Sequence, residues 1–310
     1  MPRRISPIAL SVLTAIVALA LPQSTAEAAS TDRPSRPNIV IILADDLGFS
    51  DVGCYGSEIA TPNIDRLAAN GIRFNQFYNC ARCCPTRASI LTGLYPHQTG
   101  VGHMLGAWNH PAYSGGINEK CATIAELLRT GGYRTYHVGK WHVGGVGKGD
   151  NRNHPMNRGF DHARGTGGGG SFFDLAPIYF DLKPVEWEPG EYATDAFTDG
   201  AVGFIDDHRR EHAGKPFFLN VCYTAPHFPL HAKPEDIEKY VGKYLGGWDQ
   251  LRARRYQKQQ ELGLLLAENC RLSPRDLIAQ AWEDVSESDR QEWDRRMAVH
   301  AAMVDCMDQG

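Results

Sequence analysis

The sequence has little net charge and no concentration of basic residues. Its 310 residues include 32 Lys and Arg against 36 Asp and Glu, so the formal net charge is only −4. A nucleic-acid-binding domain typically carries Lys and Arg along one face or one helix, and we therefore expect no nucleic-acid partner. With 42% hydrophobic and 22% charged residues and no internal repeat, the composition is typical of a soluble globular protein with one large or two modest domains.

The N-terminal region lacks an apolar run long enough to cross a bilayer comfortably. Residues 8–21 are mainly apolar, but a membrane-spanning helix takes about 20 such residues. Two arginines precede this run, and Ala26-Glu27-Ala28 follows it as a small-x-small cleavage site. We therefore predict a signal peptide over residues 1–28, a polar linker over residues 29–37 and a periplasmic or secreted mature protein with no stable membrane insertion. A retained signal anchor is the alternative.

Cysteine is too sparse for the disulfide framework of a small secreted domain. The chain has 8 cysteines. One or two disulfides are therefore an open alternative, but the sequence does not indicate which cysteines would pair. Cys80 and Cys83 have the spacing of a CxxC motif, but a thioredoxin-like interpretation needs that motif at a helix start within a βαβ unit. A zinc site needs a second pair of ligands, and neither this motif nor His137 with His142 has one at a suitable spacing.

Apolar runs alternate with helical patterns along the chain. The runs that predict buried strands cover residues 38–44, 133–138 and 216–224. The patterns that predict helices cover residues 61–71, 88–94 and 123–129, and an amphipathic pattern at residues 293–307 predicts a closing helix. This alternation predicts an α/β layered fold.

Each predicted strand runs into polar side chains at its C-terminal end. Ligands of open α/β sheets gather outside those ends, so we expect the three clusters to share one site. Asp45 and Asp46 offer hard oxygen ligands for Ca²⁺ or Mg²⁺, with a helix cap or a solvated turn as the alternative. Lys140 and His142 together suit an anionic substrate, unless they only flank a packed tryptophan. His227 stands between two prolines, which fix its backbone and so the direction of its imidazole. A structural histidine in a turn is the alternative.

A second anion-binding feature begins at Cys83. The sequence from there is Cys-x-Pro-x-Arg and continues into a predicted helix. The amides and the positive dipole end of that helix would face residue 83, and Arg87 adds a cation within one turn. The glycine-rich segments 143–149 and 165–170 are predicted to be mobile loops. The second matches GxGxxG only by letter, because the sequence predicts no strand before it and no helix after it.

These segments together resemble one known family. Residues 83–93, CCPTRASILTG, are similar to the signature of the type I sulfatases, which include the arylsulfatases. Further segments match the family in the same order along the chain, namely residues 38–48, 61–68, 132–142, 225–230 and 242–249. The last of these segments resembles a bacterial arylsulfatase subgroup. The resemblance implies an α/β, alkaline-phosphatase-like layered fold with a mixed central sheet flanked by helices. It assigns residues 38–310 to an N-terminal catalytic domain.

The resemblance also implies a chemistry. A maturation enzyme would oxidise Cys83 to Cα-formylglycine, and the matured protein would hydrolyse sulfate monoesters of the arylsulfatase type with a bound Ca²⁺, Mg²⁺ being less favoured. The implied catalytic residues are Cys83, Arg87, Lys140, His142 and His227. The implied metal ligands are Asp45, Asp46 and residue 83.

The family pattern continues where this sequence ends. In the family, a later strand carries an Asp-Asn pair for the metal, and a second active-site lysine follows. We therefore expect a missing C-terminal part, an incomplete calcium site, an open sheet edge and impaired activity of this chain alone. The alternatives to a sulfatase are a phosphonate or phosphate ester hydrolase of the same superfamily, a non-catalytic pseudo-sulfatase that binds ligands, and a redox protein based on Cys80 and Cys83.

Overall fold

The computed structural model describes residues 36–146, 152–175, 177–266 and 268–310. The predicted signal peptide and the greater part of the predicted linker lie outside these residues. Among the residues described, no helix is both long and apolar enough to cross a membrane.

A mixed sheet of six strands forms the centre of the fold, in the order β1-β6-β2-β3-β4-β5. Four neighbouring strands are parallel: β1 (Ile39–Leu43), β6 (Phe217–Cys222), β2 (Arg134–Lys140) and β3 (His162–Thr166). Two short strands continue the sheet in antiparallel fashion: β4 (Ile178–Phe180) and β5 (Lys183–Val185). The mixed sheet predicted from the family resemblance is confirmed.

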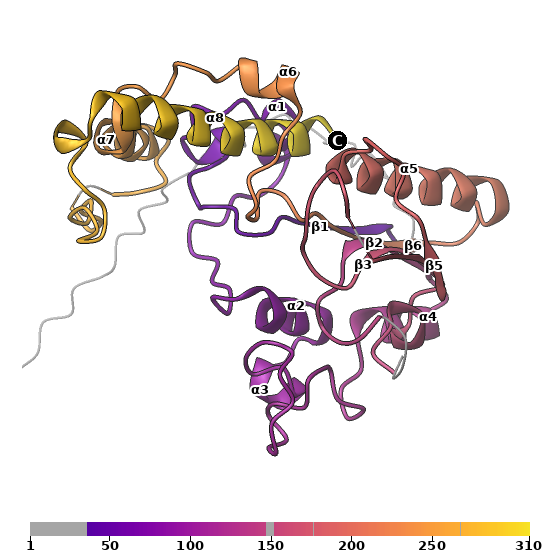
Figure 1. The fold of residues 1–310 in the computed structure, drawn as a ribbon. Helices are drawn as coiled ribbons and strands as arrows, with labels where there is room; N and C mark the ends of the chain where they lie inside the picture. Colours follow the sequence, from indigo (N-terminus) through magenta and orange to yellow (C-terminus); the bar gives the residue numbers. More distant parts are fainter. Residues whose placement is uncertain (1–35, 147–151, 176, 267) are drawn as a thin grey trace, which may run out of the picture. The chain divides into compact units, whose positions relative to one another are not determined.

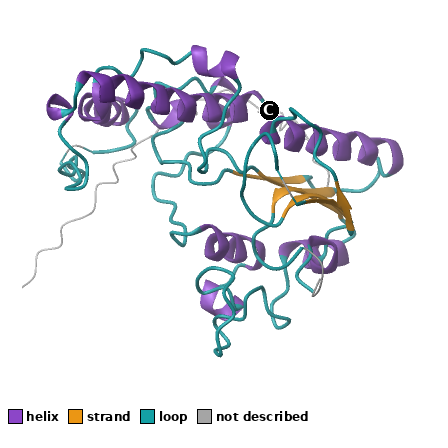
Figure 2. Cartoon of the chain, viewed as in Figure 1, coloured by secondary structure: helices purple, strands orange, loops and turns teal. Residues whose placement is uncertain are grey.

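Helices cover both faces of this sheet. On one face lies α5 (Ala193–Glu211), and on the other lie α2 (Cys83–Thr92) and α4 (Ile124–Thr130) (Figure 1). Each face has its own apolar cluster, one including Phe197 and Phe204 of α5 and the other including Leu91 of α2 and Ala125 of α4. The layering follows from the parallel strands, because strands joined by crossover connections need cover on both sides. Figure 2 shows the same layers by type of secondary structure.

The first strand departs from the prediction of a fully buried strand. β1 lies at the edge of the sheet and pairs only with β6 among the described strands. Ile39 and Ile41 pack against the core on the α2 side, whereas Val40 and Ile42 remain 48% and 59% exposed. The alternation of side chains along a strand explains this difference, since only one face of β1 is covered.

The structure describes five further helices and three 3₁₀ turns. They are α1 (Pro62–Asn70), α3 (Pro96–Thr99), α6 (Pro234–Glu238), α7 (Gly247–Glu261) and α8 (Glu287–Gln309), with 3₁₀ turns η1 (Gly53–Tyr55), η2 (Pro155–Arg158) and η3 (Trp282–Asp284). The predicted helix at residues 88–94 begins earlier than expected, at Cys83, so two adjacent cysteines occupy its first turn. Pro85 is tolerated there because the first amides of a helix have no partner within the helix.

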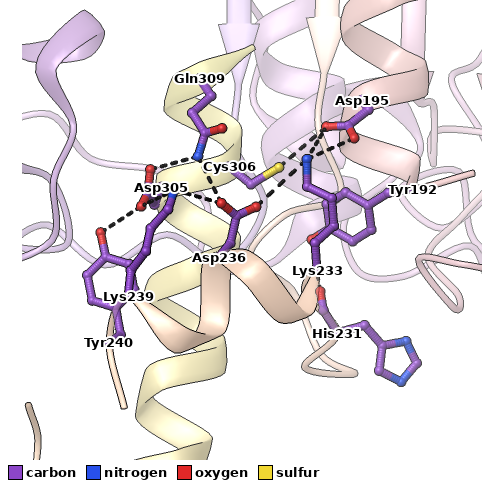
Figure 3. A network of polar contacts seen from close by, with 10 residues as sticks. All are labelled: Tyr192, Asp195, His231, Lys233, Asp236, Lys239, Tyr240, Asp305, Cys306 and Gln309. Carbon is purple, nitrogen blue, oxygen red and sulfur yellow. Dashed lines mark hydrogen bonds and ion pairs between the residues drawn. The ribbon is translucent and has the colours of Figure 1, made fainter. Parts of the chain in front are cut away.

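A polar network joins α8 to α6 and α5 (Figure 3). Asp305 on α8 accepts hydrogen bonds from Tyr240 at 2.9 Å and Lys239 at 3.3 Å. Asp236 on α6 bridges Lys239 at 2.7 Å and Gln309 at 3.2 Å. Because both carboxylates are buried, these partners are needed to offset the cost of their desolvation. The network therefore fixes α8 firmly against α6.

Candidate active site

The polar side chains at the ends of β1 and β2 meet as a buried ion cluster. Asp45 follows β1, and its Oδ2 atom accepts a short hydrogen bond from the Nζ atom of Lys140, at the end of β2. The guanidinium Nη2 atom of Arg87, on α2, lies 3.4 Å from the same carboxylate oxygen. All three residues are at most 4% exposed. The strand ends thus share one site, as the parallel arrangement requires.

Arg87 has unused hydrogen-bonding capacity in this cluster. Its Nη1 atom donates to the carbonyl oxygen of Lys140 at 2.7 Å, but its Nε and Nη2 atoms are buried without a hydrogen-bond partner among the described residues. Buried polar groups without partners are rare in folded proteins. A guanidinium with free donors near the N-terminus of a helix is suited to binding an anion.

Cys83 is the first residue of α2, next to this cluster. A hydrogen bond from Cys84 lowers the pKa of the Cys83 thiol, and the imidazole of His142 and the cation of Lys140 lower it further. The same contact and burial raise the pKa of Cys84. Among these groups, Cys83 is therefore the one that favours the anionic form.

His142 reaches the site through an unusual backbone conformation. Its φ angle is 54°, and its amide donates to the carbonyl oxygen of Gly167 at 3.0 Å. The side chain of the intervening Trp141 points into the core, and its Nε1 atom donates to Asn153 at 2.6 Å. Lys140 and His142 therefore face the site, whereas the Trp141 between them packs in the core. The Nδ1 atom of His142 is buried and has no hydrogen-bond partner in the described part of the chain.

The two aspartates predicted to bind one metal ion point to different partners. Asp45 faces Lys140 and Arg87, whereas the more exposed Asp46, with a φ angle of 61°, lies with its Oδ2 atom 3.5 Å from the Nε2 atom of His227. The third polar cluster is thus connected to the first through Asp46. The structure brings every predicted site residue to this edge of the sheet, with the two carboxylates facing different partners.

The glycine-rich segment 165–170 lies against the site, which the sequence interpretation missed. A Cβ atom built on Gly169 would be 3.5 Å from the Nζ atom of Lys140 and 3.9 Å from the Cε1 atom of His227. The statement that no strand precedes this segment is wrong, because β3 ends at Thr166. A glycine run directly after a parallel strand was the signal that would have revealed this segment, since such strands end at the shared edge.

The donors at this edge have the chemistry that a hard cation prefers. Carboxylate oxygens suit Ca²⁺, which takes about six to eight oxygen ligands. Asp45 and Asp46 supply such oxygens, and no third carboxylate groups with them among the residues described. The chemistry of these residues therefore fits a calcium ion, for which they would provide some of the ligands.

His137, considered as a zinc ligand with His142, has a different place in the structure. It is fully buried in β2, where its Nδ1 atom lies 3.1 Å from the side-chain amide of Asn220 on β6. Burial, with a contribution from Arg87, lowers the pKa of His137 to about 3. His137 is therefore a neutral core residue that joins two strands.

Comparison with protein families shows to which family this chain belongs. The model of the sulfatase family matches residues 37–310. The chain belongs to the sulfatase family.

Individual sulfatases show how far the likeness extends. An uncharacterised sulfatase from Schizosaccharomyces pombe is 36% identical over 299 residues, which cover 88% of this chain and 52% of that protein. An arylsulfatase from Klebsiella aerogenes is 30% identical over 310 residues, which cover 94% of this chain and 64% of that protein. This sulfatase chain therefore spans between about half and two thirds of the length of these relatives.

The solved structures support the fold. The crystal structure of Ps i-CgsB in complex with k-i-k-neocarrahexaose has a TM-score of 0.63 and 30% sequence identity to this chain. The match covers 88% of this chain and 53% of that one. The alkaline-phosphatase-like α/β fold expected for the family is thereby confirmed.

Proposed function

We propose that this sulfatase hydrolyses sulfate monoesters, as a sulfuric ester hydrolase of the arylsulfatase type. The observation that carries the proposal is the buried ion cluster, in which the cations of Arg87 and Lys140 face the single carboxylate of Asp45. These cations suit a tetrahedral ester anion. Membership of the sulfatase family, matched over residues 37–310, supports the sulfate ester as that anion.

The proposal includes conversion of Cys83 to formylglycine by a maturation enzyme and a Ca²⁺ ion near it. Asp45, Asp46 and residue 83 would hold the ion, which supplies neutralisation of sulfate charge and activation of a bound hydroxyl when present. The protein would act in the periplasm or outside the cell, in keeping with the signal-peptide pattern of residues 1–28.

The other side chains have distinct tasks in this proposal. Arg87, whose Nε and Nη2 atoms have no hydrogen-bond partner among the described residues, would offer these donors to the nucleophilic group on residue 83 and to the ester anion. Lys140, held by Asp45, binds a sulfate oxygen. The imidazole of His142 lies within 4.8 Å of the sulfur atom of Cys83 and would accept a proton from residue 83. His227, oriented by Asp46, assists the leaving oxygen.

The sulfate and phosphate esters of 4-nitrophenol provide the test of this function. The protein, produced together with a formylglycine-generating enzyme and supplied with Ca²⁺, is expected to hydrolyse the sulfate ester with a kcat/KM at least about tenfold higher, a difference of about 1.4 kcal/mol in transition-state binding. Higher activity on the phosphate ester would instead support a phosphate or phosphonate ester hydrolase. Tight ester binding with no turnover of either would support a non-catalytic binding protein.

The glycine-rich segment leads to a second prediction. Gly169→Leu would place its side chain between Lys140 and His227, where the proposed ester anion binds, and is expected to lower kcat/KM by about 10²-fold, as small displacements in active sites do. Gly169→Ala is the matched control, because a Cβ atom there makes only ordinary contacts of 3.5 Å or more. Equal activity of both variants would show that this segment does not border the anion.

A further inference from the structure

A second set of metal ligands occurs at the start of α2, apart from the carboxylates. The side chains of Cys83, Cys84 and His142 bring two sulfur atoms and one imidazole nitrogen within 4.8 Å of one another. This is the only group of three His, Cys, Asp or Glu ligands that the described part of the chain brings so close together. Neither the CxxC spacing nor the pair of histidines in the sequence identifies it.

The fold explains how neighbouring cysteines and a distant histidine converge. Cys83 and Cys84 occupy the first turn of α2, where Cys84 is fully buried and Cys83 is partly exposed. His142 follows β2, and its positive φ angle of 54° turns the chain at that point. Since His142 and Cys83 are both partly exposed, solvent has a route to the cluster.

We propose that the chain with an unmodified Cys83 binds a borderline-soft divalent cation, with Zn²⁺ as the type case, through the sulfur atoms of Cys83 and Cys84 and the imidazole of His142. Two thiolates and one imidazole match the ligand preference of zinc, and three protein ligands leave the fourth tetrahedral position open to water. On binding, the thiols release their protons to solvent, and the two negative charges balance the charge of the ion.

The hard oxygen donors and the soft sulfur donors of this region prefer different metal ions. The carboxylates of Asp45 and Asp46 suit calcium, whereas the sulfur atoms of Cys83 and Cys84 suit zinc. The nearest cations, Lys140 and Arg87, oppose binding of any cation, but Asp45 offsets part of their charge. We therefore expect zinc to be retained in the presence of excess calcium.

The zinc site exists only before residue 83 is modified. A formylglycine at position 83 has no sulfur atom, so one of the three ligands disappears on maturation. Zinc binding does not depend on the proposed sulfatase activity, because it needs only the thiol form and the observed arrangement of side chains. Bound zinc would also cover the Cys83 sulfur on which the proposed maturation acts.

Titration of the unmodified protein tests the proposal. The protein is produced without a maturation enzyme, kept reduced with a phosphine that does not bind the metal, and titrated with ZnCl₂ and, as a spectroscopic probe, CoCl₂ in the presence of excess CaCl₂. We expect binding of one ion with sulfur-to-cobalt charge-transfer absorption. Cys84→Ser should weaken zinc binding at least about tenfold, since even loss of supporting contacts costs about 10- to 100-fold.

Two further variants make the test decisive. Cys80→Ser is the matched control, because the Cys80 sulfur lies 3.5 Å from Ser89 and outside the cluster, and it should bind zinc as the parent protein does. His142→Gln changes a partly exposed ligand and should weaken zinc binding and alter the cobalt spectrum even if the buried Cys84→Ser variant folds poorly. Unchanged binding in His142→Gln, or equal loss in Cys80→Ser, would overturn the proposal.

Discussion

Replacing Cys83 with alanine is expected to abolish sulfate ester hydrolysis by the matured protein. The side chain at position 83 is the proposed nucleophile, and loss of an enzyme's nucleophile typically lowers kcat by about 10⁴-fold or more. Cys83 is half-buried at the helix start, so removal of its sulfur leaves the packing of the core largely intact. The measurement is kcat for 4-nitrophenyl sulfate, together with a thermal unfolding curve to verify folding.

The adjacent cysteine provides the control for this variant. Cys84→Ala keeps the Cys-x-Pro-x-Arg pattern, because residue 84 is its variable position, and it should retain far more activity than Cys83→Ala. Peptide mass analysis of the matured parent protein should find an aldehyde or its hydrate at residue 83. Substantial turnover by Cys83→Ala, or a free thiol at residue 83 in active protein, would exclude this residue as the nucleophile.

The sequence predicted the location of the site because the physics of parallel sheets is simple. Strands that run in the same direction end at the same edge, so the polar residues after β1, β2 and β6 had to meet. The ion pair between Asp45 and Lys140, 95 positions apart in the chain, is the direct result. The same reasoning predicted the alternation of strands and helices, although α2 begins five residues earlier than predicted and β2 ends two residues later.

Other features depend on contacts that no local pattern contains. Whether Val40 is buried depends on what covers the outer face of β1, not on its own apolar run. Asp45 and Asp46 face different partners, and no sequence pattern indicates the positive φ angle of Asp46. The proximity of Cys84 to His142 arises only when α2 packs against the end of β2. Spacing rules for zinc sites miss such a cluster because they describe ligands within continuous motifs.

Asp45→Ala is expected to lower the free energy of unfolding by about 3–5 kcal/mol, the usual effect of removing one member of a buried ion pair. The variant leaves Lys140 and Arg87 as buried cations without a carboxylate. Lys140→Met should cost less, because Asp45 then keeps Arg87 at 3.4 Å. Urea unfolding gives both values. The exposed pair of Arg296 and Glu292 supplies the control, with an expected effect of at most about 1 kcal/mol for Glu292→Ala.

The same variant connects stability with the proposed anion site. If Arg87 and Lys140 form the sulfate site, inorganic sulfate should partly replace the lost carboxylate of Asp45. A ligand that binds only the folded state stabilises it in proportion to the logarithm of its concentration, so sulfate should raise the melting temperature of Asp45→Ala more than that of the parent protein. Chloride at equal ionic strength controls for general salt effects. A small loss of stability in Asp45→Ala, or equal effects of sulfate on both proteins, would mean that the two cations do not form an anion site built around Asp45.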